Sequence, residues 1–136
     1  MQPESLRDAI AGATCSRLVV QEAWYRGELV EPANLLFLQV DGSRWIRCFI
    51  DAGFFGWRAA EAPVQISAAE AAPEFEYPLV DLTARLRAIG SQVRDVTLTE
   101  RPLSGADLEI CFDGGGVLRL RNADDVTRLE FSPPAG

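Results

Sequence analysis

The residues best suited to chemistry lie between Arg44 and Ala60, in the stretch RWIRCFIDAGFFGWRAA, where charged side chains alternate with large aromatic rings. Trp45, Arg47 and Asp51 could line a pocket for a small ligand, because ligand pockets combine apolar walls with a few polar groups that orient the ligand. Asp51 stands beside the aromatic residues and is the first carboxylate to consider as a general acid or base. One hypothesis is therefore a small-ligand-binding domain or a carboxylate-dependent enzyme.

Two absences limit the catalytic chemistry open to this chain. It contains no histidine, and its 13 basic residues are all arginine. Catalytic triads with a histidine base, His-ligated metals, Schiff-base lysines and Walker phosphate loops each need one of the missing side chains. Carboxylate pairs and oxygen-ligated Mg²⁺ or Ca²⁺ remain as possible catalytic groups. With 20 acidic residues, however, some carboxylates lie close together in any fold, so the sequence does not identify a catalytic pair. A non-enzymatic chain without catalytic residues is therefore expected.

The glycine-flanked aromatic cluster DAGFFGW offers a second kind of site. Gly53 and Gly56 bracket Phe54 and Phe55, and Trp57 follows directly, so the sequence places three large rings on a short, permissive loop. Aromatic residues that stay exposed on such a loop are typical anchors of a partner contact. Packing into the core explains the same rings equally well, because large aromatic side chains are mostly buried.

A third candidate site is the segment EFEYP. In an extended conformation Glu74 and Glu76 point to one side, while Phe75 and Tyr77 point to the other. Glu74, Glu76 and Tyr77 could then contribute to a contact with a basic protein partner. An ordinary edge strand protected by charge explains the pattern as well.

The net charge of −7 bears on the kind of partner. Nucleic acid is disfavoured as a partner, because phosphates are bound by clustered basic residues and the arginines of this chain are scattered. An acidic surface suits solubility, and it also suits attraction to a basic protein. Mutual repulsion predicts that the chain alone is a monomer or a weak dimer.

Two short motifs have simpler explanations than a cofactor or metal site. The run DGGGV at 113–117 leads into a strand pattern, so a turn fits it better than a phosphate-binding loop, which a helix would follow. Asp124 and Asp125, together with Asp113, could supply oxygen ligands to a cation. An Asn-Asp turn needs no metal, however, and the EF-hand spacing is absent. No cofactor and no metal are expected.

The cysteines and the hydropathy pattern indicate the compartment. Cys15, Cys48 and Cys111 are odd in number and widely spaced, which favours buried thiols over disulfides or a zinc site. The first residues lack the basic and apolar regions of a signal peptide, and no segment reaches the roughly 18 apolar residues of a membrane span. A cytoplasmic protein without membrane contact is therefore expected.

Two helices are predicted to position these candidate sites. Residues 3–11 read as a short helix, with acidic residues in the first turn and Gly12 after its end. A second helix is predicted over 79–89, because its leucines and Ile89 stand at helical spacing and Gly90 follows as a natural stop.

Strands are predicted wherever apolar and polar residues alternate. One or two strands span 16–30, a hairpin turns at the Asp-Gly pair 41–42, and a meander of four strands follows the second helix. The Ala/Glu/Pro-rich segment 58–78 reads as a connecting excursion that holds one short strand at 64–67. Together these elements predict an α+β fold in a single domain, 1–136, with a mainly antiparallel sheet of about seven strands built from hairpins.

The loop length of the first hairpin determines which of its side chains share a face of the sheet. For Leu36 and Leu38 to share a side with Ile46 and Cys48, the loop must contain an odd number of residues. A three-residue loop with Gly42 in the left-handed conformation meets this condition.

The opposite face of this hairpin is also apolar and needs cover. It carries Phe37, Trp45 and Phe49, together with Arg47. We expect the helix over 79–89 to pack on it, because that helix has a single apolar stripe. A ligand pocket, where one exists, is then expected between the sheet and this helix.

Three functions fit these observations. The leading hypothesis is a non-enzymatic protein-interaction domain that binds and neutralises a basic toxin, as bacterial immunity proteins do. The alternatives are the ligand-binding or carboxylate-dependent domain, and a structural subunit of an assembly. A flat or convex acidic surface would favour the first function, whereas a cavity that converges on Arg47 and Asp51 would favour ligand binding.

Overall fold

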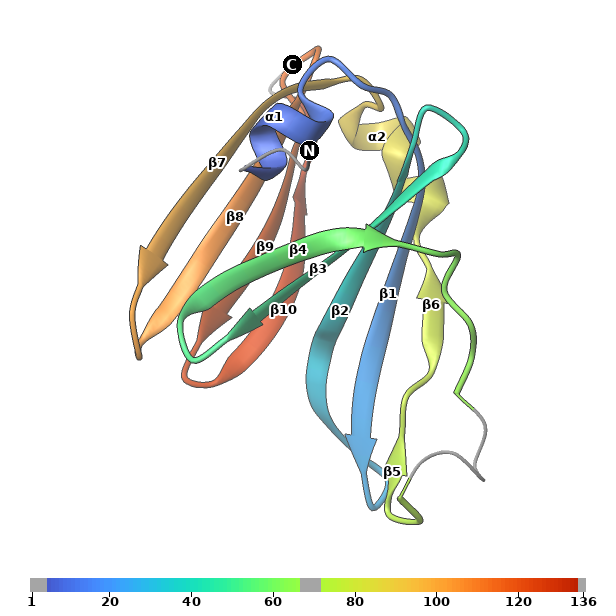
Figure 1. The fold of residues 1–136 in the computed structure, drawn as a ribbon, viewed down its shortest axis with the longest axis vertical. Coiled ribbons are helices and arrows are strands. Elements are labelled where there is room, and N and C mark those ends of the chain that lie inside the picture. The colour runs from blue at the N-terminus through green and yellow to red at the C-terminus, as the bar shows by residue number, and fades with distance from the viewer. Residues whose placement is uncertain (1–4, 67–71, 135–136) are drawn as a thin grey trace.

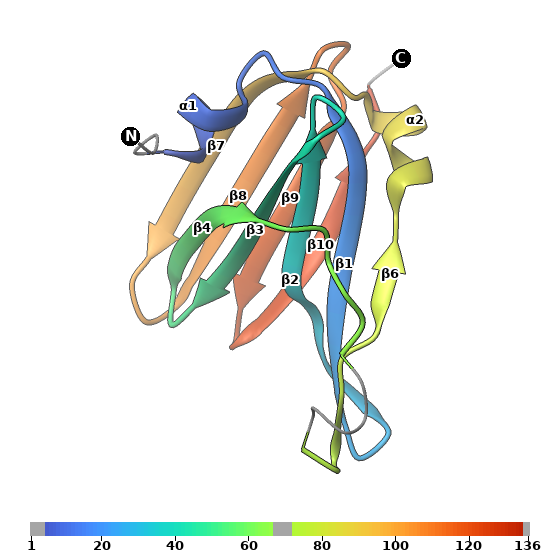
Figure 2. The same cartoon turned by 45° about the vertical axis from the view of Figure 1, so that its right-hand side comes forward.

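The computed structural model describes residues 5–66 and 72–134, which form a sandwich of two antiparallel sheets with two short helices at one end (Figures 1 and 2). The first sheet contains β1 (Cys15–Tyr25), β2 (Glu28–Val40), β3 (Arg44–Asp51), β4 (Phe54–Ala60), β5 (Phe75–Glu76) and β6 (Leu79–Asp81). Its order is β4-β3-β2-β1-β5, and β6 also pairs with β1. The α+β fold with a mainly antiparallel sheet is thus confirmed.

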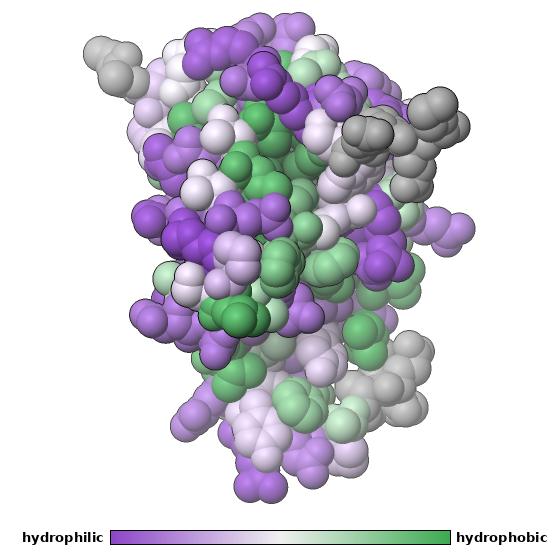
Figure 3. Space-filling view, turned by 60° about the vertical axis from the view of Figure 1, so that its left-hand side comes forward, coloured by the Kyte–Doolittle hydropathy of each residue, from purple (hydrophilic) through white to green (hydrophobic). Residues whose placement is uncertain are grey.

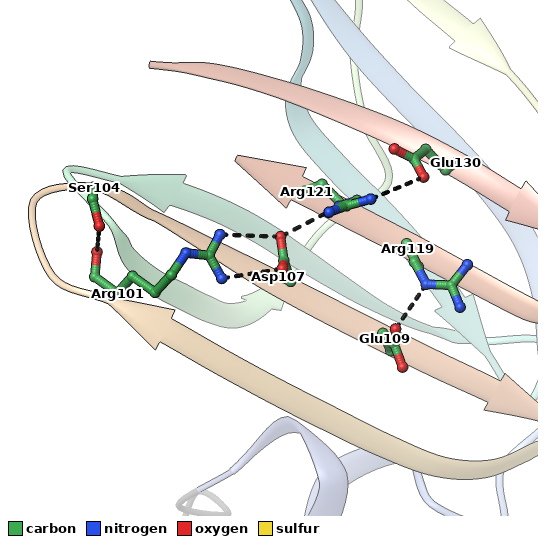
Figure 4. Close-up of polar contacts among 7 residues, drawn as sticks. All are labelled: Arg101, Ser104, Asp107, Glu109, Arg119, Arg121 and Glu130. Atoms are coloured by element: carbon green, nitrogen blue, oxygen red, sulfur yellow. Dashed lines mark hydrogen bonds and ion pairs between the residues drawn. The ribbon is translucent and has the colours of Figure 1, made fainter. Parts of the chain in front are cut away.

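The second sheet is the meander that the sequence predicts. It contains β7 (Val93–Arg101), β8 (Gly105–Phe112), β9 (Val117–Ala123) and β10 (Val126–Ser132), in the order β10-β9-β8-β7. Its outer face carries ion pairs, including Arg119 to Glu109 and Asp107 to both Arg101 and Arg121 (Figure 4). This face therefore meets water, as alternation predicts.

The main core lies between the two sheets. Both sheets contribute alternate strand residues to it, and both helices close it at one end. Its largest fully buried side chains are Phe112, Ile10, Leu18, Leu36, Leu38, Ile89, Leu108, Ile110, Leu118 and Leu120.

The β2–β3 hairpin has the predicted three-residue loop. Val40 pairs with Arg44, so residues 41–43 form the loop, and both Asp41 and Gly42 have positive φ. Leu36 pairs with Cys48 and so shares its face of the sheet, which lies in the core. The odd loop length accounts for this register.

A bulge in β2 makes it diverge from β3. Gln21 pairs with Leu35 and Ala23 pairs with Glu31, so residues 32–34 of β2 stand opposite Glu22 alone. Pro32, which has no N–H to donate, lies within the bulge. Pairing of β2 with β3 ends at the Leu36–Cys48 pair, and beyond it β2 runs beside β10.

The second helix is much shorter than predicted. Leu79 lies in β6, where it pairs with Gln21, and only a 3₁₀ turn η1 (Thr83–Arg85) and α2 (Leu86–Ile89) are helical. The prediction of a helix over 79–89 is wrong for its first half because those residues find backbone partners on β1. Asp81 then ends the strand, and its carboxylate accepts a hydrogen bond of 2.9 Å from the Thr83 N–H.

The first helix, α1 (Leu6–Ile10), lies within the predicted range 3–11 but is shorter, and residues 3 and 4 fall outside the described residues. Ser5 caps the helix by accepting a bond of 3.1 Å from the Asp8 N–H. In the chain from residue 5 to 66 and from 72 to 134, no helix has the length and apolar character to cross a membrane.

The outer face of the first sheet is covered differently from the prediction. Trp45 and Phe37 are each 7% exposed and form a small cluster with Val19, so their assignment to the interior is confirmed. The helix over 79–89 does not cover them, however, because Leu86 and Ile89 of α2 pack into the main core. Leu79 of β6 and the Arg17 guanidinium, 5.3 Å from the Trp45 ring centroid, lie against the cluster instead.

The described residues between β4 and β6 are mostly irregular, apart from β5. Residues 64–66 form no strand, which contradicts the prediction at 64–67, and Ser67 falls outside the described residues. The Gln65 amide holds the segment in place, because it donates to the Tyr77 carbonyl at 2.9 Å and accepts from the Leu79 N–H at 3.0 Å.

Candidate functional site

The three aromatic residues of DAGFFGW lie on a strand, not on a loop. Ala52 and Gly53 form a tight turn, and Phe54 begins β4. A Cβ on Gly53 would lie 2.5 Å from the Arg101 carbonyl oxygen, because the β3–β4 and β7–β8 turns touch. The Leu103 N–H donates to the Ala52 carbonyl at 2.9 Å and joins the two turns. The prediction that the three rings stand on a short loop is therefore wrong.

Strand alternation sends these rings to different sides. Phe55 and Trp57 pack partly against the main core, whereas Phe54 points the other way and is 52% exposed. The three rings therefore do not act together as one contact surface.

The acidic strip lies far from these rings. Glu76 is in β5 and pairs with Trp24 of β1, so it occupies the opposite edge of the first sheet from β4. Glu74 and Glu76 are exposed, while Tyr77 stacks on Phe75 with ring centroids 6.0 Å apart. The alternation is as predicted, but the six candidate partner-binding residues form two separate sites.

Arg47 and Asp51 line a cavity of about 620 Å³ at the place where β2 and β3 diverge. The β9–β10 turn supplies a further wall. The polar lining residues are Glu31, Asn34, Arg47, Asp51, Arg58, Asn122 and Asp125, and the apolar ones are Leu35, Phe49, Ile50 and Ala52. The cavity thus draws on both sheets and on four separate segments.

Trp45 does not belong to this cavity. It lines a smaller hollow of about 240 Å³ at the other end of β3, together with Trp57 and Ala9. The predicted pocket residues are thus only partly brought together. The expected position between the sheet and the second helix is also wrong, because no residue of α2 lines either hollow.

Arg47 and Arg58 are the two basic residues of the large cavity. They face each other directly across β3 and β4, and neither forms an ion pair with a carboxylate of the described residues. Arg47 Nε is buried, and within the described chain it has no hydrogen-bond partner. The sequence missed Arg58, because the two glycines before it indicate a loop and conceal that it shares a face with Arg47.

The acidic side of the cavity is partly engaged in holding the fold. The Glu31 carboxylate accepts a short hydrogen bond from the Thr127 N–H of β10. Burial raises the pKa of Glu31, and this hydrogen bond and Arg128 only partly offset the effect. Asp124 and Asp125 both have positive φ in the β9–β10 turn, which agrees with a simple two-residue hairpin turn.

A second candidate surface is the open side of the sandwich, where the edge strands β4 and β7 flank a groove of about 380 Å³. Figure 3 looks onto this side and shows hydrophobic side chains gathered along its middle. Phe55, Trp57, Val96, Leu98 and Leu108 supply this apolar lining. Glu100 closes part of the edge by accepting a bond of 2.9 Å from the Phe55 N–H.

Two of the three thiols, those of Cys15 and Cys48, are buried and offer little reactivity. Burial raises the pKa of Cys15 and of Cys48 to about 12, so neither forms a nucleophilic thiolate at neutral pH. Over the residues that the structure describes, no three Cys, Asp or Glu side chains gather as ligands for a metal ion. The run at 113–117 is a turn with Gly114 and Gly115 at positive φ, and β9 follows it.

Comparison of the chain with protein-family models, with curated proteins and with solved structures found no match.

Proposed function

We propose that this chain is a small-ligand-binding domain whose site is the cavity between β2, β3 and the β9–β10 turn. The observation that carries the proposal is the convergence of Arg47 and Asp51 on one cavity of about 620 Å³. Cavities of roughly 300–1,000 Å³ are typical of ligand sites, with a few polar groups that fix the orientation of the ligand.

The walls of the cavity are held by contacts that need no ligand. The Glu31–Thr127 hydrogen bond ties β2 to β10, and the Leu103–Ala52 hydrogen bond fixes the end of the β3–β4 hairpin. A cavity with fixed walls binds without a large ordering cost, because little conformational freedom is lost when the ligand enters.

The polar groups of the lining are suited to binding and orienting a ligand. The cavity wall contains carboxylates, amides and guanidinium groups but no hydroxyl, thiol, imidazole or amine side chain. These groups orient a ligand through hydrogen bonds and charge, and none of them is one of the usual activated nucleophiles of acyl transfer.

The test is a heteronuclear NMR titration of the isotope-labelled chain with a library of small polar fragments that includes inorganic phosphate, malate, glucose and ethanolamine. A ligand of the cavity should shift the amide signals of Arg47 and Asp51 together with those of Asn122 and Asp125, which lie on the other sheet. Saturable shifts in both groups support the proposal. Shifts confined to one sheet, or no saturable shift with any fragment, would overturn it.

A second candidate function, protein binding, is favoured by the open side between β4 and β7. Two edge strands and an apolar groove together can accept a partner's strand or side chains. In this proposal the acidic chain binds a protein such as a basic toxin. Leu98→Glu on β7 should then abolish capture of that partner, while Arg58→Gln at the cavity should leave it intact. The reverse pattern would place partner binding at the cavity.

A further inference from the structure

We propose that Arg47 and Arg58 clamp an oxyanion, the carboxylate or phosphate group of a small ligand, and this inference rests on the ligand-binding function proposed above. Arg47 and Arg58 are direct cross-strand partners on β3 and β4. Like charges in this arrangement repel, so the pair is destabilising unless an anion lies between or beside the two guanidinium groups.

In the other sheet three arginines lie beside carboxylates. Across β8 and β9, Arg119 faces Glu109 with Nε 2.7 Å from the carboxylate. Asp107 lies 3.1 Å from Arg101 and 3.6 Å from Arg121 (Figure 4). In a chain with 20 acidic and 13 basic residues, carboxylates are plentiful. A facing pair of arginines without an ion pair is thus a departure from the pattern of the neighbouring sheet.

Arg121 also faces a like charge, Arg128, across β9 and β10. Asp107 and Glu130 lie 3.6 and 3.7 Å from Arg121, however, and compensate its charge. Arg47 and Arg58 have no such carboxylate within the described chain.

The burial of Arg47 Nε also favours an anion at this site. Its Nε is buried and finds no hydrogen-bond acceptor in the described residues. A buried donor without an acceptor costs free energy, and such groups are rare in native proteins unless a ligand, ion or water completes them. An oxyanion in the cavity would accept this hydrogen bond, because guanidinium groups match carboxylate and phosphate oxygens in geometry.

The exposed side chain of Arg58 lies over an aromatic ring. Its guanidinium carbon lies 5.9 Å from the centroid of the Phe49 ring, and that ring covers Gly56 so closely that a Cβ there would lie 2.3 Å from it. An arginine that lies over a ring keeps its N–H groups available in the guanidinium plane. Phe49 and Gly56 therefore preorganise Arg58 for an anion.

The rest of the lining narrows the class of ligand. Asp51 and Asp125 line the same cavity and would repel a polyanion. The amide nitrogens of Asn34 and Asn122 already donate to Gln21 and Thr127, so these side chains offer their carbonyl oxygens as acceptors. The ligand that fits is a small molecule with one carboxylate or phosphate group at the arginines and hydroxyl or amine donors toward the aspartates.

The experiment follows the Nε–H signals of Arg47 and Arg58 by NMR while the full chain is titrated with inorganic phosphate, lactate or ethanolamine, at an ionic strength held constant with NaCl. Phosphate or lactate, which has one carboxylate and one hydroxyl group, should shift both signals saturably, and the more effective anion identifies the group. Arg47→Gln and Arg58→Gln should each weaken binding by roughly tenfold or more, because a charge-assisted hydrogen bond is lost. Arg58→Lys, which keeps the charge but loses the planar fork, should also weaken it and guards against misfolding of the glutamine variant.

The matched control is Arg87→Gln, the same charge change at an exposed arginine of α2. It should leave the affinity unchanged, and an equal loss would overturn the clamp because binding would then reflect net charge alone. Saturation by ethanolamine but by neither anion would also overturn the clamp, although ligand binding would stand. Failure of every fragment to reach the cavity would overturn the clamp and the proposed function together.

Discussion

The ring of Phe49 lies directly over Gly56, its cross-strand partner, with no room for a side chain at position 56. A Cβ there would lie 2.3 Å from the ring. Gly56 is not at positive φ, so it is required by this close approach and not by its backbone conformation. The same Phe49 ring lies against the Arg58 guanidinium, so the close packing of Phe49 on Gly56 also bears on the proposed anion site.

Gly56→Ala should therefore destabilise the protein by about 1–3 kcal/mol, because the added methyl group overpacks against Phe49. Denaturant unfolding measures the change. In a Phe49→Ala background the same substitution should cost little, and the double-mutant cycle isolates the contact. An equal cost in both backgrounds would show that the ring is not what restricts position 56.

Trp45→Ala should cost about 3–5 kcal/mol, because Trp45 is a buried aromatic of the outer-face cluster. Trp24→Ala is the control, since Trp24 is only half-buried, and it should cost less. A near-wild-type unfolding curve for Trp45→Ala would show that the outer face is not a second core.

The chain alone should sediment as a monomer or a weak dimer at neutral pH, because its net charge of −7 opposes self-association. A tight dimer that Leu98→Glu dissociates would instead identify the open side between β4 and β7 as a structural interface. Val64→Glu is the matched control, because Val64 is exposed but lies outside that groove.

Glu31→Gln should make the protein more stable than the wild type at neutral pH. Burial raises the pKa of Glu31 above its usual value of 4.5, so the folded state holds the Glu31 proton more tightly than the unfolded state does. Wild-type stability then falls as the pH rises from 4.5 through the folded-state pKa. Glutamine avoids this loss and can still accept the Thr127 hydrogen bond.

Urea unfolding at several pH values tests this prediction, with Glu28→Gln, an exposed carboxylate of the same strand, as the control. The advantage of Glu31→Gln should shrink as the pH falls below 4.5. An advantage that grows at low pH would contradict it.

Local patterns predict most of this fold, and they fail where a distant strand competes. Alternation and the Asp-Gly turn predict the β2–β3 register, because both are properties of neighbouring residues. The leucine spacing over 79–89 predicts a helix, but Val80 pairs with Val20 of β1, sixty residues away in sequence. The helical spacing of the leucines does not indicate that the edge of β1 is available for pairing.

The candidate site was predictable only in part, for the same reason. Arg47 and Asp51 lie four residues apart on one strand, so alternation places their side chains on the same face. The sequence alone could therefore identify both as candidate site residues. Arg58 was hidden because Gly56 indicates a flexible loop, whereas its real role is to admit the Phe49 ring. Asn122 and Asp125 can line the cavity because β2 diverges from β3. No local pattern in the sequence reveals this divergence.

In the proposed clamp Arg47 serves to bind a ligand and does not stabilise the ligand-free fold, so the stability of Arg47→Met is the decisive measurement. Methionine keeps much of the aliphatic stem while removing the facing charge and the unpaired Nε–H. Urea unfolding without phosphate or other added oxyanions should show a variant at least as stable as the wild type, with a gain of about 1 kcal/mol. Arg119→Met, which breaks the ion pair with Glu109, should lose stability in the same assay. A loss of about 1 kcal/mol or more for Arg47→Met would contradict the account, because Arg47 would then stabilise the ligand-free fold.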